Sequence, residues 1–149
     1  MKCHQRIIRD KIMRDEPRPV QESLDGCGVH PITRAQAASI ILEYEWLGTM
    51  PKVGLAYYGL ISPTGELLGA SCFGTGSGTN AANVCGPEHK HLAVCLERGA
   101  CVPWAHPHAA SFQTAASCKQ AHKDHGWSIF YGYSDSEAGE IGTIYQACN

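Results

Sequence analysis

The clearest hydrophobic pattern in the chain lies over residues 37–44, where apolar side chains recur at the i, i+3, i+4 and i+7 positions of an α-helix. Thr33 and Gln36 precede this stretch with the spacing of a capping box, in which each side chain bonds to the backbone of the other. Gly48 and Pro51 favour termination, since glycine suits the left-handed end of a helix and proline cannot extend one. The pattern predicts a helix that begins at Thr33 and ends at Gly48, with residues 43–48 in its last turn.

Two apolar stretches after this helix, residues 53–62 and 66–74, predict the two strands of a β-hairpin. The sequence Ser-Pro-Thr-Gly at residues 62–65 favours a turn between them, with proline second and glycine fourth. Residues 74–86 are rich in glycine but lack the Lys-Ser/Thr ending of a phosphate-binding P-loop. We therefore expect two buried strands followed by a mobile loop.

The second half of the chain predicts a strand, a helix and another strand. Alternating apolar residues indicate strands within residues 91–105 and over residues 127–133. Between them, residues 108–124 have helical spacing, and Gly126 favours the end of that helix. A unit of this length is typical of a right-handed crossover between parallel strands.

The last stretch, residues 134–149, predicts a terminal helix with two glycines inside it. Gly139 and Gly142 would each cost that helix about 1 kcal/mol relative to alanine. We interpret them as positions where the helix approaches the sheet or a ligand closely. The order of elements then predicts a single α/β domain, with a mixed β-sheet flanked by helices.

The composition limits how this domain could bind nucleic acid. With 149 residues, of which 44% are hydrophobic, the chain can form one domain with a substantial core. Its net charge of -2 gives no general attraction to polyanions, so binding would require a local basic patch. We interpret residues 1–30 as a basic arm before a domain over residues 31–149; a solvated helix face or a frayed terminus is the alternative. The basic residues of the arm are Lys2, Arg6, Arg9, Lys11, Arg14 and Arg18.

Three other features narrow the class of protein. No apolar run approaches the roughly 18 residues needed to cross a bilayer, and no secretory signal is present, so we expect a cytoplasmic protein without membrane contact. The eight cysteines include no C-x-x-C pair, and we interpret them as buried thiols. Three histidine pairs could chelate a metal, but their spacings match no metal motif and surface histidines are the simpler interpretation. The pairs are His89 and His91, His106 and His108, and His122 and His125.

Asp135 and Tyr145 are the first candidates for catalytic chemistry. Asp135 follows the last predicted strand, at the sheet edge where ligands bind, and the terminal helix would bring the Tyr145 hydroxyl into the same crevice as a proton donor. In the alternative, Ser134 or Asp135 caps the helix and Tyr145 packs in the core. The helix start near residues 108–111 lies at the same edge, and its backbone N–H groups suit a pyrophosphate such as that of coenzyme A.

Four segments in this order resemble the bacteriophage Mom family of DNA-modifying proteins: EYEWLGTMP, LERGACV, AASF and YSDSEAGEIGTIYQACN. The similarity extends from about Ile32 to Asn149 and is most specific in the last segment. The resemblance implies a GNAT-like fold, similar to that of GNAT-type acyltransferases. It also implies transfer of a carbamoylmethyl (acetamido) group to the N6 amino group of adenine in double-stranded DNA, which shields phage DNA from restriction in the host cytoplasm.

The resemblance also implies catalytic roles for three residues. Adenine N6 is a weak nucleophile, so a carboxylate must take its proton, and Asp135 and Glu45 are the candidates. Tyr145 is the candidate that protonates the leaving group or orients the donor. The family often has His-Tyr where this chain has Glu45 and Trp46, which leaves open whether Glu45 is a base, a metal ligand or neither.

Substrate contacts follow from the geometry of duplex DNA. Because the N6 amino group is base-paired, the enzyme must flip the adenine out of the helix and hold it by stacking. Tyr44, Trp46 and Trp104 are the stacking candidates. The basic arm, together with Arg98, would hold phosphates.

The resemblance also bears on the group donor, the metal and the oligomeric state. The fold suggests an acyl-CoA donor held at Ala110 and Ser111, and iron is associated with the family, although its ligands are not assigned. A homodimer is one option for the oligomeric state. GNAT-type domains continue with further strands, so the chain is either truncated at Asn149 or completes its sheet in another way.

Two other functions compete with DNA modification. A GNAT-type N-acyltransferase acting on a small amine or a protein would bind acyl-CoA tightly and would have no affinity for duplex DNA. A metal- or nucleic-acid-binding module built on the histidine pairs would not be an enzyme, and the change Tyr145→Phe would leave it unaffected.

Overall fold

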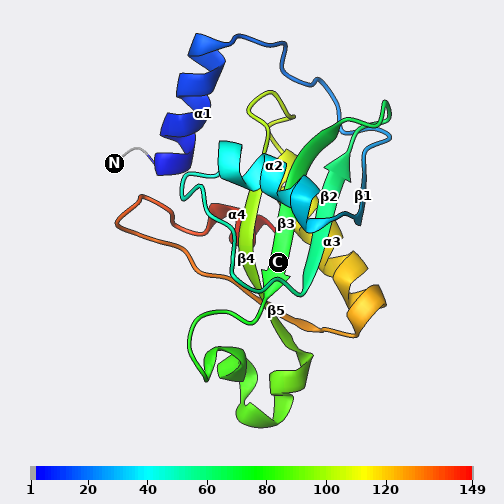
Figure 1. Cartoon of the computed structure of the whole chain (residues 1–149), viewed down its shortest axis with the longest axis vertical. Helices are drawn as coiled ribbons and strands as arrows, with labels where there is room; N and C mark the ends of the chain where they lie inside the picture. Colours follow the sequence, from blue (N-terminus) through cyan, green and yellow to red (C-terminus); the bar gives the residue numbers. More distant parts are fainter. Residues whose placement is uncertain (1–2, 149) are drawn as a thin grey trace.

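A five-stranded mixed β-sheet forms the centre of the domain in the computed structural model (Figure 1). The structure describes residues 3–148, so Lys2 of the predicted basic arm and Asn149 lie outside the described residues. Neighbouring strands in the order β1-β2-β3-β4-β5 are antiparallel, except that β4 and β5 are parallel. The strands are β1 (Gly28–Pro31), β2 (Ala56–Ile61), β3 (Leu67–Gly74), β4 (Ala93–Cys101) and β5 (Ile129–Tyr131).

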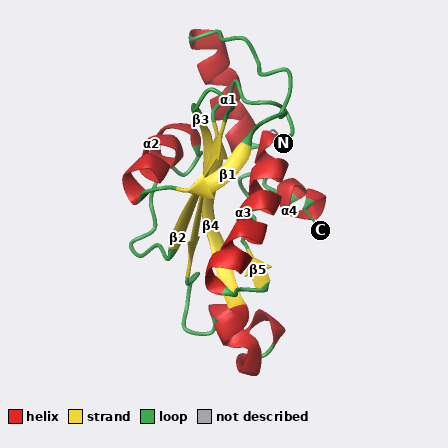
Figure 2. Ribbon diagram, turned by 90° about the vertical axis from the view of Figure 1, so that its right-hand side faces the viewer, coloured by secondary structure: helices red, strands yellow, loops and turns green. Residues whose placement is uncertain are grey.

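Helices cover both faces of this sheet. Helix α2 lies on one face, whereas α3 and α4 lie on the other (Figure 2). Helix α1 lies at one end of the domain, and the short 3-10 helices η1 and η2 lie at the opposite end (Figure 1). No helix within residues 3–148 is both long and apolar enough to cross a membrane. The helices are α1 (His4–Asp15), α2 (Arg34–Tyr44), η1 (Ala81–Cys85), η2 (Pro87–Leu92), α3 (Ala109–His125) and α4 (Thr143–Ala147).

The predicted start of α2 is confirmed, but its predicted end is wrong. The Thr33 hydroxyl accepts a hydrogen bond from the Gln36 backbone N–H at 3.2 Å, and the Gln36 side-chain oxygen accepts one from the Thr33 N–H at 2.9 Å. Such a cap contributes about 1 kcal/mol to stability. The helix ends at Tyr44, and Glu45 follows it with an extended backbone. Glu45 is therefore free of the helical register and can reach toward the sheet.

The predicted hairpin and the predicted parallel pair are both confirmed. β2 and β3 are antiparallel neighbours, with Tyr58 opposite Ser71. β4 and β5 are parallel neighbours joined through α3, with Val94 opposite Phe130. The structure is thus the single α/β domain that the sequence predicted, with helices on both sides of a mixed sheet.

The middle strand β3 holds both helical layers. Cys72 belongs to the apolar cluster in which Ile41 of α2 packs on the sheet. Ser71, its neighbour, accepts hydrogen bonds from the Gln113 side-chain amide at 2.9 Å and from the Ser117 hydroxyl at 3.3 Å. These buried polar contacts fix α3 to the central strand, because a buried polar group without a partner is costly. The position of the start of α3 is thereby fixed as well.

The two parallel strands diverge soon after they begin. They pair only over residues 93–95 and 129–131, after which β4 continues along β3 to Cys101 while β5 ends. Glu97 is an extra residue of β4 relative to β3, which makes a β-bulge. The carboxyl half of β4 therefore has no strand partner on the β5 side, and this edge forms a wall of the site described below.

The closing segment differs from its prediction. Only Thr143–Ala147 is helical, and Gly139 and Gly142 lie before that helix with φ values of 75° and 71°. This left-handed conformation suits glycine and interrupts a helix, which is why the longer helix does not form. The close approach is made instead by Gly132, where a Cβ atom would lie 2.9 Å from the Tyr145 ring.

The sequence pattern missed four elements, one of which is the 3-10 helix η2 before β4. The basic arm contains the ordered helix α1, which has no buried residue. The short strand β1 pairs with β2 at the edge of the sheet. The glycine-rich loop predicted over residues 74–86 contains η1.

Candidate active site

A pocket of about 1070 Å³ opens beside the carboxyl half of β4. The segment after α2, the start of α3, the chain leading into α4 and the first turns of α1 form its other walls. It therefore lies where the sequence placed the ligand site, at the carboxyl ends of the parallel strands. The predicted residues that line it are Glu45, Trp46, Arg98, Ala110, Ser111, Asp135 and Tyr145.

Glu45 is a buried carboxylate on the wall of this pocket. Its side chain is 9% exposed, and one oxygen, Oε1, accepts a hydrogen bond from the Gly99 backbone N–H at 3.3 Å. The other oxygen, Oε2, is buried and has no hydrogen-bond partner, although Arg98 Nε lies 3.6 Å away, at ion-pair distance. Burial raises the pKa of Glu45 to about 7, against the lowering effects of Arg98 and of the Gly99 hydrogen bond. Glu45 can therefore exchange a proton near neutral pH.

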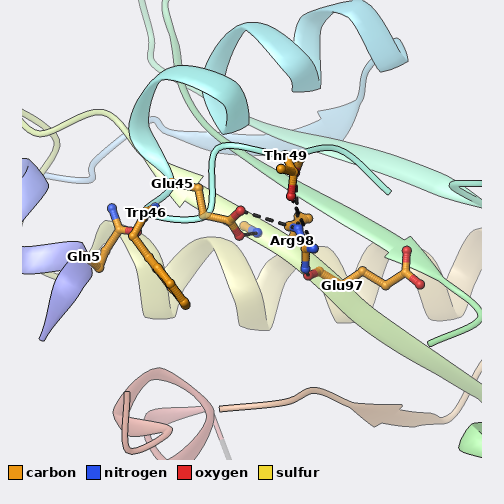
Figure 3. Close-up of polar contacts among 7 residues, drawn as sticks. Gln5, Glu45, Trp46, Thr49, Glu97 and Arg98 are labelled. Carbon is orange, nitrogen blue, oxygen red and sulfur yellow. Dashed lines mark hydrogen bonds and ion pairs between the residues drawn. The ribbon is translucent and has the colours of Figure 1, made fainter. Parts of the chain in front are cut away.

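Arg98 is held by the segment that follows Glu45 (Figure 3). Its Nε donates to the Thr49 carbonyl oxygen at 3.2 Å, and its Nη1 donates to the Glu97 carbonyl oxygen at 2.6 Å. Glu97 itself points away from Glu45 along β4, and its Oε1 accepts a hydrogen bond from the Gly76 N–H at 2.9 Å (Figure 3). Because backbone carbonyls occupy much of the guanidinium, Arg98 neutralises Glu45 only in part.

Asp135 lines the same pocket but its side chain has a local partner. The Asp135 Oδ1 atom accepts hydrogen bonds from the backbone N–H groups of Glu137 at 2.9 Å and Ala138 at 3.3 Å. The residue is exposed. The prediction that it directly follows a strand is wrong, since β5 ends at Tyr131. The alternative of a cap is correct in part, because Asp135 caps a turn rather than a helix.

Tyr145 projects from α4 toward the pocket, with its ring against the backbone of Gly132. Burial, with the nearby Cys95 and Glu45, raises the pKa of its phenol. The hydroxyl forms no hydrogen bond with the side chains or backbone of residues 3–148. The phenol therefore stays protonated at neutral pH and is free to donate to a ligand.

Two of the three predicted stacking residues lie outside the pocket. The rings of Tyr44 and Trp104 contact each other edge to face, with centroids 5.7 Å apart. Trp104 also lies under the Arg18 guanidinium at 4.1 Å, and its Nε1 donates to Glu66 at 3.1 Å. Trp104 is thus part of a separate surface cluster, and stacking on a base in the pocket is not available to Tyr44 or Trp104.

The structure adds residues that sequence reasoning missed. Tyr133 lines the pocket with 59% of its surface exposed, and Ile141, at 71%, lines it too. Exposed apolar residues of this size often mark binding surfaces. The alternation of residues 127–133 indicated a strand and gave no reason to place Tyr133 in a site. Ile141, between the turns at Gly139 and Gly142, lines the same pocket.

Iron does not fit the described residues. Within residues 3–148, no three His, Cys, Asp or Glu side chains come close enough together to hold a metal ion. The histidine pairs have ordinary contacts instead: His122 Nδ1 lies 2.7 Å from the Trp127 carbonyl oxygen, and the His125 ring stacks on Trp127 at 4.2 Å. The His106 ring accepts a hydrogen bond from the His108 backbone N–H at 3.1 Å. The metal-binding module considered above therefore has no support in this structure.

The start of α3 is at the pocket wall, as predicted. His108 is the N-cap residue and makes no capping hydrogen bond with its side chain. The Ser111 hydroxyl donates back to the His108 carbonyl oxygen at 3.1 Å and so does not cap the helix either. The first turn of α3, with Ala110 and Ser111, thus presents backbone N–H groups on the pocket side.

Comparison with known proteins identifies the family. No curated protein sequence matches the chain. The model of the Mom protein family matches residues 27–149, which include every strand and all of the pocket except the part contributed by α1. The chain therefore belongs to the Mom protein family, and this membership indicates an enzyme that modifies phage DNA.

Proposed function

We propose that this protein transfers a carbamoylmethyl group to the N6 amino group of adenine in duplex DNA, and so protects phage DNA from restriction in the host cytoplasm. Membership of the Mom family supports DNA as the substrate. The observation that carries the chemistry is Glu45, a buried carboxylate with one unpartnered oxygen on the wall of a large pocket.

The pocket suits a flipped adenine. Its volume of about 1070 Å³ is at the upper end of the range for small-molecule sites, which leaves space for a purine and part of a donor. Trp46 and Tyr133 offer aromatic faces at its wall. Stacking on such faces contributes about 1–3 kcal/mol per base, which is comparable with the few kcal/mol that unstacking costs.

The charges in the pocket favour a base over a phosphate. Its lining includes the carboxylates of Glu45, Asp135 and Glu140, with Arg98 as the cation beside Glu45. Glu97 turns its carboxylate toward Gly76, and Arg6 and Arg9 are exposed on α1, so the interior repels the DNA backbone but admits a neutral purine. The lone pair of N6 is delocalised into the ring, and the amine becomes nucleophilic only as its proton leaves. Glu45 accepts that proton in our proposal, because a base with a pKa of about 7 is matched to neutral pH.

Tyr145 and Asp135 have different roles in this mechanism. Tyr145, which remains protonated, donates its phenolic proton to the leaving group or to an oxygen of the donor. Asp135 shapes the turn that holds the final segment against the pocket, since its carboxylate accepts two backbone N–H groups. Arg98, whose Nε lies 3.6 Å from Glu45 Oε2, favours the ionised form of Glu45, which is the form that accepts the proton.

A GNAT-like fold and an acyl-CoA donor form the finer part of the proposal. The divergence of β4 from β5, the bulge at Glu97 and the crossover through α3 support such a fold. The N-terminal turn of α3, with Ala110 and Ser111, fits a pyrophosphate, and the open edge of β4 fits the amide groups of an extended arm. When bound, an acyl-CoA would supply an activated carbonyl carbon and give an N6-acyl adenine; the carbamoylmethyl product that we propose requires instead a donor with an electrophilic methylene carbon and a leaving group on it.

The chemical identity of the modified adenine distinguishes acetyl transfer from carbamoylmethyl transfer. A plain acetyl transfer would place a carbonyl carbon on N6, whereas a carbamoylmethyl group places a methylene carbon there. The two modified nucleosides differ in mass and in their fragments. The identity of the product therefore tests the donor class as well as the target atom.

The acidic interior also favours a second candidate function. Carboxylates around Glu45 would attract a small cationic amine, as an N-acyltransferase acting on a small amine or a protein requires. Such an enzyme would leave DNA unmodified. It would also bind acyl-CoA in the absence of DNA.

Nucleoside mass spectrometry of plasmid DNA from cells that express the full-length protein tests the proposal. We expect deoxyadenosine carrying a carbamoylmethyl group, and its loss when Glu45→Gln is expressed at the same level. Unmodified deoxyadenosine from cells that contain the folded protein would contradict DNA modification. An acetylated deoxyadenosine would retain the target and correct the transferred group.

A further inference from the structure

Helix α1 lies outside the part of the chain that the family model matches, yet it forms part of the pocket. The matched part begins at residue 27, whereas α1 spans His4–Asp15. Gln5, Arg6 and Arg9 line the pocket from this helix. One wall of the pocket is thus formed by a helix that lies outside the family match.

The helix is attached on both sides of the pocket by polar contacts. On one side, Gln5 donates to the Tyr44 carbonyl oxygen and accepts from the Trp46 N–H at 3.0 Å, so it bonds to the backbone on each flank of Glu45 (Figure 3). On the other side, the His4 N–H donates to the Ala138 carbonyl oxygen at 3.0 Å. These contacts fix the first turns of α1 at the pocket mouth, although no residue of α1 is buried.

The two arginines that α1 contributes to the pocket are exposed and only weakly paired. The first turn of α1 contains no acidic residue. Arg6 is exposed and forms no ion pair with any of residues 3–148. Among residues 3–148, the ion pair of Arg9 is with its neighbour Asp10, at 3.4 Å, and exposed pairs of this kind contribute little. Two arginines are therefore available at the rim of a pocket whose interior is acidic.

We propose that α1 binds the DNA backbone at the pocket mouth, where Arg6 and Arg9 contact the phosphates next to the flipped nucleotide. This inference rests on the proposed function, because it takes DNA as the substrate. A duplex whose base enters an acidic pocket needs cationic contacts outside that pocket to hold its phosphates. Arginine provides them through charge and through paired N–H donors.

The salt dependence of DNA binding measures such contacts directly. Each phosphate that a cationic side chain neutralises adds about 0.9 to the slope of log K against log salt concentration for duplex DNA. Removal of a phosphate contact therefore lowers the slope by about one and weakens binding to all sequences equally. A structural role of the same residue would not change the slope in this way.

Fluorescence anisotropy with a labelled duplex, over a series of salt concentrations, provides the test with the full-length protein. We expect Arg6→Gln and Arg9→Gln each to lower the slope by about 0.9, and the double variant by about twice that. Arg14→Gln is the matched control, because Arg14 lies on the same helix but does not line the pocket. It should leave the slope within experimental error of the wild type.

The outcomes separate this inference from the proposed function. If the wild-type protein binds and modifies DNA but Arg6→Gln and Arg9→Gln keep its slope, α1 does not contact the backbone and only this inference is overturned. An equal change in Arg14→Gln would also overturn it, since the effect would then reflect net charge. If the folded wild-type protein neither binds nor modifies duplex DNA, both proposals fail.

Discussion

Glu45 and Asp135 line the same pocket from different segments of the chain, but their surroundings differ. Glu45 is buried, shares Arg98 with backbone carbonyls and has one oxygen without a hydrogen bond. Asp135 is exposed, and its Oδ1 accepts two backbone N–H groups. Two carboxylates that the sequence offered as equal candidates thus differ in their surroundings, and in our proposal Glu45 moves a proton whereas Asp135 holds a turn.

Replacement of each carboxylate by its amide should give the largest contrast. Glu45→Gln removes the proposed base and should lower the yield of modified deoxyadenosine by about 10²–10⁴-fold, the usual contribution of general base catalysis. Asp135→Asn keeps an oxygen at the Oδ1 position and should lower it far less. The yields are measured by nucleoside mass spectrometry at matched protein levels. A greater loss in Asp135→Asn would reverse our assignment of the two residues.

The pH dependence of stability should separate Glu45 from its amide variant. Burial raises the pKa of Glu45 from 4.5 to about 7, so the folded state holds this proton more tightly than the unfolded state. The contribution of Glu45 to stability is then fully present below pH 4.5 and is lost as the pH rises through about 7. The full loss corresponds to about 3 kcal/mol in the free energy of unfolding.

Urea unfolding of the wild type and Glu45→Gln at several pH values measures this effect. The difference in free energy of unfolding between the two proteins should change across the window from 4.5 to about 7, in favour of the variant at the higher pH. Parallel curves for the two proteins would show that Glu45 is not buried as described.

The backbone around Glu45 should depend on Gln5. Gln5→Ala removes the two hydrogen bonds on the flanks of Glu45, and at about 1 kcal/mol each we expect a loss of up to roughly thirtyfold in modification rate. The acid limb of the pH–rate profile should also move to lower pH, because Glu45 becomes more hydrated. Gln120→Ala on the exposed side of α3 is the control. An unchanged profile in Gln5→Ala would mean that α1 does not position Glu45.

We expect the smallest effect from substitutions in the turn that Asp135 caps. Asp135→Ala removes the acceptor of the Glu137 and Ala138 N–H groups and should lower the free energy of unfolding by about 1 kcal/mol. Asp135→Asn should lower it less, because one oxygen remains. Thermal unfolding of the two variants checks the order. Equal stability of Asp135→Ala and the wild type would remove the structural role that we assign to Asp135.

The sequence predicted the parts of the fold that local patterns determine. The capping box of α2, the turn of the hairpin and Gly126 at the end of α3 all depend on neighbouring residues, and each is found where it was expected. Helix α1 could not be predicted, because its attachment depends on contacts such as Gln5 with Tyr44, which lie far apart in the chain.

The sequence predicted some residues of the site, but not how their side chains are packed. Motif order placed Glu45, Asp135 and Tyr145 near one another, and the structure places all three on one pocket. Sequence could not distinguish Trp46, which lines that pocket, from Trp104, which is held by Arg18 and Glu66 elsewhere. Nor could it show that one carboxylate is buried, since burial depends on the packing of α2, β4 and α1 together.

The titration of Glu45 itself tests the central claim most directly. The side-chain carboxyl carbon of Glu45 can be followed by ¹³C NMR in the full-length protein and assigned by its absence in Glu45→Gln. A midpoint of about 7 would agree with a buried carboxylate able to accept the proton of adenine N6. A midpoint near 4.5 would show an ordinary solvated glutamate and would contradict Glu45 as the base.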